Sequence, residues 1–145
     1  MIIKDLETHL LAALTGAEEV WIAAALITDD GYQKILPALT GIKQNYLIGI
    51  NLPTSPDVLQ QIKDNIQPGR VNIRLAGETP TFHPKVYIIK KSDGYLAFVG
   101  SANLTAPGLH GNHELSYLVS NQDDCKALVR WFNHSTTKHV DSGAW

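Results

Sequence analysis

Apolar residues along the first half of the chain predict helices and strands in turn. Gly16 ends a run of apolar residues at helical spacing: Ile3, Leu6, Leu10 and Leu14. Two apolar runs of strand length, residues 19–28 and 45–51, predict buried strands. Asp29 or Asp30 is expected to cap a short helix between them. Alternating strands and helices predict parallel strand pairing in this half.

The middle of the chain predicts one more helix and one more strand. Ser55 is placed to cap the helix, with Pro56 at its first position and Pro68-Gly69 after its end. Residues 70–75 alternate apolar and polar side chains, which is typical of a half-exposed strand. A loop is expected over residues 77–80.

The second half predicts a β-hairpin, a further strand and a last helix. Runs 83–90 and 95–100 flank a turn that contains Asp-Gly, a strong hairpin signal. A loop is expected from Ser101 to Gly111, and a strand over residues 114–119. The last helix, capped by Asp123 or Asp124, carries four apolar residues on its inward face: Cys125, Leu128, Val129 and Phe132. The whole pattern predicts an α/β fold with a mixed β-sheet flanked by helices.

Length and composition indicate one ordinary globular domain. The chain has 145 residues, of which 44% are hydrophobic and 18% charged. We expect the domain to span residues 1–134, followed by a polar tail or the start of a linker over residues 135–145. The formal net charge of −2 argues against a strongly basic nucleic-acid coat, although a local basic patch is compatible with it.

The cysteine count and the apolar runs indicate the compartment. Cys125 is the only cysteine, so a disulfide framework within one chain is impossible. Charged residues near the start, among them Lys4 and Asp5, interrupt any signal-peptide apolar region. The longest uncharged apolar run, Val20 to Ile27, is too short to span a bilayer. These features predict a soluble, cytoplasmic protein without a membrane partner.

Four polar residues are expected to meet at one mouth of the hairpin. His83 and Lys85 are two residues apart on a predicted strand, so they share a face. Ser101 and Asn103 have the same spacing at the end of the partner strand. Either pair alone also fits a partly exposed strand edge or a common turn. Opposite each other on a hairpin, the two pairs indicate a polar site.

These residues resemble a known motif. His83-Pro84-Lys85 followed by Gly100-Ser101-Ala102-Asn103 is similar to the HxK…GSxN signature of the phospholipase D superfamily. Glu114 stands where that family commonly carries an acidic residue on the next strand. The resemblance covers about residues 82–115. The chain departs from it at Lys90, where the family's fuller motif has an aspartate.

The resemblance implies a phospholipase D-like domain and a metal-independent phosphodiesterase that needs no cofactor. It implies that His83 attacks phosphorus to form a phosphohistidine, and that Lys85 and Asn103 hold the phosphoryl oxygens. Glu114 would accept a histidine ring N–H, and Ser101 would orient the surrounding groups. The family supplies the leaving-group acid from a second motif. Since this chain has one His-x-Lys, we expect a homodimer in which two copies of His83 face each other.

Several functions fit such a site. A short chain with a single motif resembles the nuclease branch, which predicts a DNA endonuclease and a fused or separate DNA-recognition or helicase domain. A phospholipase or small-diester hydrolase is one alternative, and a non-catalytic binding or dimerisation module, favoured by Lys90, is another. His110 and His113 would be metal ligands beside Glu114 in a rival interpretation, or simply loop histidines. Sequence preference, and the choice among DNA, RNA and lipid, stay open at this point.

Overall fold

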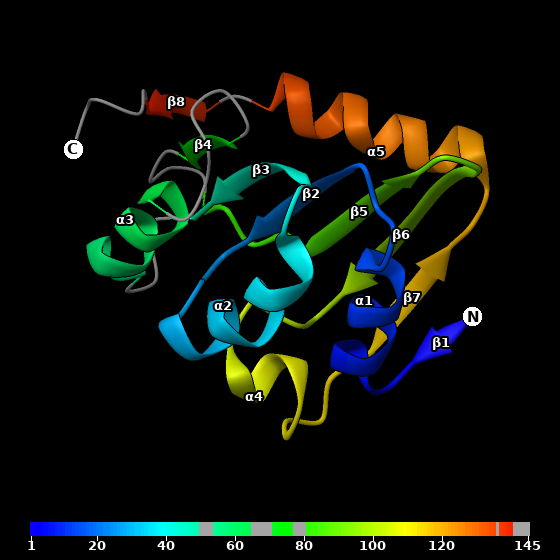
Figure 1. Cartoon of the computed structure of the whole chain (residues 1–145), viewed down its shortest axis with the longest axis horizontal. Coiled ribbons are helices and arrows are strands. Elements are labelled where there is room, and N and C mark those ends of the chain that lie inside the picture. The colour runs from blue at the N-terminus through cyan, green and yellow to red at the C-terminus, as the bar shows by residue number, and fades with distance from the viewer. Residues whose placement is uncertain (50–53, 65–70, 77–80, 136, 141–145) are drawn as a thin grey trace.

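An eight-stranded mixed sheet runs through the described part of the chain, in the order β1-β7-β6-β5-β2-β3-β4-β8 (Figure 1). The structure is a computed structural model, and it describes residues 1–49, 54–64, 71–76, 81–135 and 137–140. The strands are β1 Ile2–Ile3, β2 Glu19–Ala24, β3 Lys43–Ile48, β4 Val71–Ala76, β5 Val86–Lys91, β6 Gly94–Gly100, β7 Ser116–Val119 and β8 Thr137–Val140.

Strand directions agree with the sequence pattern. β2, β3 and β4 pair in parallel, as the strand–helix alternation of the first half predicts. β5 and β6 form the predicted antiparallel hairpin. β5 also pairs antiparallel with β2, so the hairpin is joined directly to the parallel half of the sheet. The expected α/β fold with a mixed sheet is therefore confirmed.

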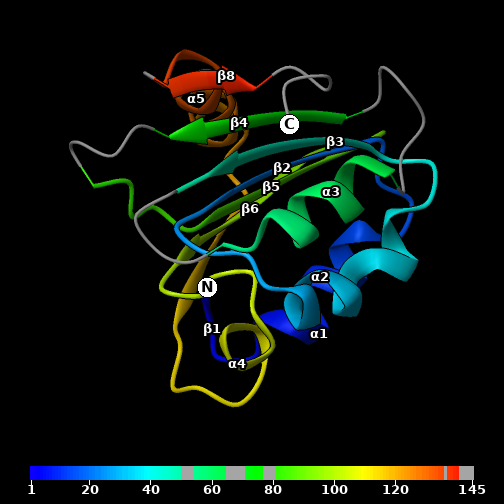
Figure 2. The ribbon, with the colours of Figure 1, turned by 90° about the vertical axis from the view of Figure 1, so that its left-hand side faces the viewer.

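Helices cover both faces of the sheet. They are α1 Leu6–Leu14, α2 Asp29–Ile35, α3 Pro56–Asp64, α4 Ala106–Leu109 and α5 Gln122–His134, with a short 3-10 helix, η1 Leu36–Leu39, after α2. Figure 2 shows α1, α2 and α3 against one face and α5 against the other. No helix in the described part of the chain is long and apolar enough to cross a membrane.

Each face of the sheet has its own apolar cluster. The larger cluster lies beneath α1, α2 and α3 and includes the fully buried Tyr32 and Tyr46. The smaller one lies between the sheet and α5 and includes Trp21, Cys125 and Phe132. The inward face predicted for the last helix is thus confirmed. Burial of one large apolar side chain such as that of Phe132 stabilises the fold by roughly 1.5–3 kcal/mol.

The helix caps differ from the expected ones. Thr28, not Asp29 or Asp30, caps α2, because its side chain accepts a hydrogen bond from the N–H of Gly31. Asn121 caps α5 in the same way. The predicted cap aspartates instead occupy the first helical turns, where carboxylates interact favourably with the helix dipole. An N-cap residue must be extended and precede the turn, and only Thr28 and Asn121 meet that condition.

Several helices and strands also begin or end at other residues than predicted. Ile3 lies in β1, because it pairs with β7, and the first helix begins only at Leu6. The loop expected after residue 101 contains α4, which Thr105 caps. The expected tail contains β8, which pairs with β4, while the division of the chain at residue 134 stays a prediction. The predicted features at residues 51, 66, 68–69 and 77–80 lie outside the described residues.

Candidate active site

The five residues of the motif lie where β5 begins, β6 ends and β7 begins. His83 and Lys85 precede β5 instead of lying within it, and Glu114 precedes β7 by two residues. β6 is antiparallel to both neighbours, so these three strand ends lie side by side at the same end of the strands (Figure 1). A hydrogen bond of 3.2 Å from the N–H of Gly100 to the carbonyl of Lys85 joins two of them.

His83 and Lys85 are in direct contact. The ammonium Nζ of Lys85 lies 2.5 Å from Nδ1 of the His83 ring and 3.1 Å from Nε2. The ammonium therefore lies close to both nitrogens of the imidazole ring. Because His83 is exposed while Lys85 is only 7% exposed, the imidazole is open to a ligand and the ammonium lies behind it.

Burial and a nearby carboxylate act in opposite directions on Lys85. Desolvation lowers the pKa of its ammonium, and the negative charge of Glu114 partly offsets that effect. Lys85 is consequently a positive charge held in a poorly hydrated position, where its attraction for a phosphate oxygen is strong.

Ser101 holds the Glu114 carboxylate. Its hydroxyl donates to Oε2 of Glu114, and its Oγ accepts from the N–H of Leu115 at 3.1 Å. Asn112 approaches the other carboxylate oxygen, with its Nδ2 at 3.4 Å from Oε1. In the described part of a single chain, Glu114 thus contacts Ser101 and Asn112. Its expected bond to a histidine ring stays a prediction.

Asn103 is oriented by the backbone that follows β2. Its Oδ1 accepts hydrogen bonds from the N–H groups of Ala25 and Leu26, both at 3.1 Å. These two bonds fix which end of the amide is the oxygen. Its Nδ2 has no protein partner among the described residues, so it is the end available for donation to a ligand. The amide is preorganised as a donor, as a group that stabilises an oxyanion should be.

With this geometry in place, the chain can be compared with known proteins. A family model described as "Cardiolipin synthase, PLD-like domain" matches residues 8–136. The chain belongs to this phospholipase D-like family. No curated protein sequence matches the chain closely enough for comparison.

Solved structures share the fold. NucT from Helicobacter pylori has a TM-score of 0.72 and 18% identity over 97% of this chain and 98% of its own. Nuc from Salmonella typhimurium, a phospholipase D family member, has a TM-score of 0.72 and 16% identity over 97% and 96%. TrmBL2, an archaeal chromatin protein, has a TM-score of 0.65 and 16% identity, with 97% of this chain and 54% of that chain covered.

Tyr87 adjoins the candidate active site, although the sequence analysis did not select it. Its buried hydroxyl donates a 2.9 Å hydrogen bond to the carbonyl of Ala102, between Ser101 and Asn103. Burial, and to a smaller degree the charge of Glu114, raises the pKa of Tyr87 far above its ordinary value, so the phenol stays a donor. A hydroxyl inside the apolar run of β5 was the available sequence signal.

Gly100 has a steric role in the motif. A Cβ atom at this position would lie 2.1 Å from the carbonyl oxygen of Leu115 and 2.6 Å from Cα of Ser116. Real Cβ atoms do not approach backbone so closely, so only glycine permits β6 to lie this near the start of β7. Ser101 can then reach Glu114.

Lys90, which departs from the family's aspartate, lies far from the site. Its Cα is paired with those of Glu19 and Tyr95, and its carbonyl accepts from the N–H of Glu18 at 2.8 Å. Five residues of strand separate it from Lys85, which corresponds to about 16 Å. The substitution therefore leaves the contacts of the site residues unchanged.

The rival metal interpretation finds no support in the described residues. Nδ1 of His110 lies 3.7 Å from Oδ1 of Asp5, at the start of α1. The described residues contain no group of three or more His, Cys, Asp or Glu side chains that could hold a metal ion. His113 is exposed.

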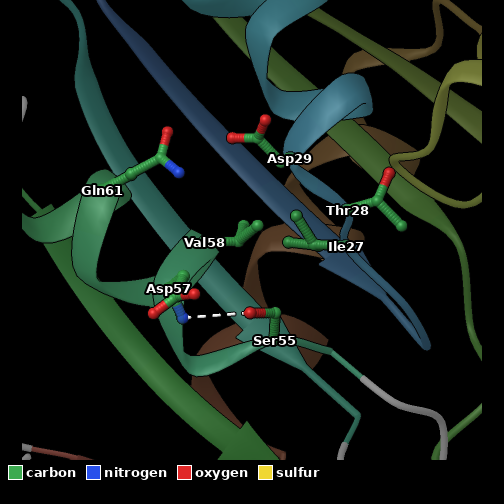
Figure 3. A pocket seen from close by; sticks show the side chains of 7 residues that line it. All are labelled: Ile27, Thr28, Asp29, Ser55, Asp57, Val58 and Gln61. Carbon is green, nitrogen blue, oxygen red and sulfur yellow. Dashed lines mark hydrogen bonds between the residues drawn. The ribbon is translucent and has the colours of Figure 1, made fainter.

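A cavity of about 350 Å³ has none of these five residues in its lining (Figure 3). It is lined by residues from the segment between β2 and α2, from the start of α2, from α3 and from the segment before α3: Ile27, Thr28, Asp29, Ser55, Asp57, Val58 and Gln61. Its polar groups are largely engaged in the fold, since Thr28 caps α2 and Ser55 accepts from the N–H of Asp57. The cavity therefore does not replace the motif as the candidate active site.

Proposed function

We propose that this phospholipase D-like domain is a metal-independent phosphodiesterase, and that it is a DNA endonuclease. The observation that carries the proposal is the contact between the exposed imidazole of His83 and the buried ammonium of Lys85. It joins a nucleophile to a phosphate-binding cation in one pair.

The first step uses both members of that pair. A phosphoryl oxygen of the bound diester accepts a hydrogen bond from the Lys85 ammonium. The ring nitrogen then has its lone pair free to attack phosphorus, and the P–O bond to the leaving group breaks. Lys85 and Nδ2 of Asn103 stabilise the charge on the remaining phosphoryl oxygens, and the product is a phosphohistidine. Water then hydrolyses the P–N bond and restores the ring.

The leaving alkoxide needs a proton, and a second copy of the chain would supply it from its own His83. In such a symmetric pair the two histidines titrate together. Glu114 would accept a ring N–H of a histidine and keep that ring in the required tautomer.

Exposed apolar residues beside the motif support this dimer. Tyr117 of β7 lies between Ile2 of β1 and Val99 of β6 in the strand register, and Leu115 follows Glu114. We call these four residues the edge patch. Their exposed fractions range from 36% for Val99 to 60% for Ile2. Exposed apolar patches of this kind mark interaction surfaces.

DNA is the substrate that the relatives favour. TrmBL2, which shares the fold, is described as binding DNA. Since the net charge of this chain is −2, we propose that a fused or separate recognition or helicase domain supplies much of the binding. A phospholipid or another small diester is the second candidate, because the matching family model is named after cardiolipin synthase.

Plasmid cleavage in excess EDTA tests the proposal. Wild-type protein should nick the plasmid without a divalent metal, and His83→Ala should not. Activity that appears only with added metal would contradict the histidine mechanism. Turnover of phospholipid vesicles without plasmid cleavage would favour the second candidate, and inactivity of both proteins on either substrate would favour a non-catalytic module.

A further inference from the structure

Two aromatic rings stack beside the nucleophile. The ring centroids of Phe82 and Trp131 are 6.4 Å apart, with 10° between the planes. Phe82 directly precedes His83, and Trp131 lies on α5, so the stack joins the helix to the active-site segment. Trp131 is nevertheless 37% exposed. A large planar side chain is therefore accessible from solvent next to the proposed site of phosphoryl transfer.

Contacts at the end of α5 hold Trp131 in place. The guanidinium of Arg74 lies 5.1 Å from the centroid of the Phe132 ring and donates to the carbonyls of Phe132 and Asn133. The hydroxyl of Ser135 donates to the carbonyl of Trp131 at 2.7 Å. These bonds satisfy backbone acceptors that a helix end would otherwise leave open. The aromatic stack is consequently presented by a fixed backbone.

After the acidic first turn, with Asp123 and Asp124, the exposed side of the same helix carries a row of basic residues. Lys126, Arg130 and His134 follow one another at spacings of four residues, and all three are exposed. Within the described residues, no carboxylate forms a salt bridge with any of them. A nucleic-acid backbone is the polyanion that such a row complements, and an aromatic side chain beside cations is the combination that single-stranded nucleic-acid sites use.

We infer that Trp131 is a stacking platform for an unpaired nucleobase that flanks the phosphate bound at His83. The inference rests on the proposed nuclease function and extends it to a substrate class, single-stranded nucleic acid. In a duplex both faces of a base are covered by its neighbours, whereas an unpaired base can leave the stack and lie on the indole. Lys126 and Arg130 of α5 would then contact the phosphates that follow.

Binding measured without turnover tests this platform. In the His83→Ala background, fluorescence anisotropy would compare a single-stranded oligonucleotide, the matching duplex and an abasic oligomer of equal length. Trp131→Ala should weaken binding of the single strand about tenfold. It should leave the abasic oligomer unchanged, and Trp131→Phe should restore most of the affinity. Tyr95→Ala is the matched control. It removes an aromatic side chain from the smaller apolar cluster, to which Phe82 also belongs, and leaves the stack of Phe82 on Trp131 intact.

The outcomes separate this inference from the proposed function. If wild-type protein cleaves DNA but Trp131→Ala binds every oligomer as before, the platform is wrong and the nuclease stands. Equal loss on the abasic oligomer would also overturn stacking. Failure to bind any of the oligomers would overturn the platform, whereas the plasmid assay decides the nuclease function, because a further domain is proposed to supply much of the DNA binding. If Trp131→Ala weakens binding to anionic phospholipid vesicles and to no oligomer, the exposed indole belongs to a membrane surface and the platform is wrong.

Discussion

The phenol of Tyr87 donates a 2.9 Å hydrogen bond to the carbonyl of Ala102, the residue between Ser101 and Asn103. Tyr87→Phe removes that donor and leaves a buried carbonyl unsatisfied, at a cost of about 1–3 kcal/mol in the free energy of unfolding. Because the lost bond anchors the motif, we also expect lower activity. Urea unfolding and diester cleavage would be measured together.

Tyr46→Phe is the matched control for this change. The hydroxyl of Tyr46, also buried, donates to Oε1 of Gln44 on the same strand, β3. The control should lose stability while keeping its activity per folded molecule. If both variants lose activity equally, the bond from Tyr87 to Ala102 has no special role in the site.

Asn103→Asp tests the orientation of the active-site amide. The new carboxylate can still accept from Ala25 and Leu26, but it cannot donate to a phosphoryl oxygen and it adds a repelling charge. Turnover should fall by about 100- to 1000-fold, with little change in unfolding. Asn121→Asp makes the same chemical change at the N-cap of α5. Asparagine and aspartate are equally good cap residues, so this variant should change neither turnover nor stability. A fully active Asn103→Asp variant would exclude the proposed donor.

The pKa of Lys85 predicts an unusual alkaline limb in the pH profile of kcat/KM. Burial lowers this pKa below the ordinary 10.5, so the ammonium that activity needs is lost at lower pH than for a solvated lysine. The free energy of unfolding changes with pH in the opposite direction. Below its folded pKa the buried ammonium costs stability, and that cost is relieved as pH rises from the folded pKa towards 10.5.

Glu114→Gln should move this limb further down, since the carboxylate raises the pKa of Lys85. Heteronuclear NMR of the lysine side chains would follow the titration even where little activity is left. A Lys85 resonance that titrates no earlier than those of the exposed lysines would refute the assignment.

Gly100→Ala should break the approach of β6 to β7. Its Cβ would overlap the carbonyl oxygen of Leu115, so the strands must separate and Ser101 must move from Glu114. We expect a loss of several degrees in Tm and of most activity. Gly16→Asn is a suitable comparison, because nothing lies within 4 Å of that position and asparagine tolerates its φ of +75°. Thermal unfolding of the two variants would decide between them.

A charge in the edge patch should weaken the proposed dimer. Tyr117 is 54% exposed in the single chain, so Tyr117→Glu has no reason to unfold it. Sedimentation should show a shift towards monomer, together with a fall in activity that higher protein concentration reverses. Ala12→Glu, on the exposed side of α1, should change neither property. An active monomer would rule out the shared site.

Local patterns in the sequence were sufficient for much of this structure. The Asp-Gly turn predicts the hairpin, and the motif residues predict where the site lies. Tertiary contacts were not predictable in the same way, because no local pattern shows that the Tyr87 hydroxyl reaches Ala102, or that Arg74 reaches the end of α5. The predicted caps were wrong for another reason. Aspartate is a favourable cap residue, but these aspartates lie inside the first helical turns, and the residues with the extended backbone of a cap are Thr28 and Asn121.

The two bonds that Asn103 accepts join residues 77 and 78 positions apart. The N-terminal half contributes none of the motif residues, yet it sets the direction of the amide that faces the substrate. Mutational tolerance should therefore be low around Ala25 and Leu26, even though their side chains carry no chemistry. In a recombined or transplanted version of this domain, the motif-bearing half would need the backbone after β2 from a compatible parent.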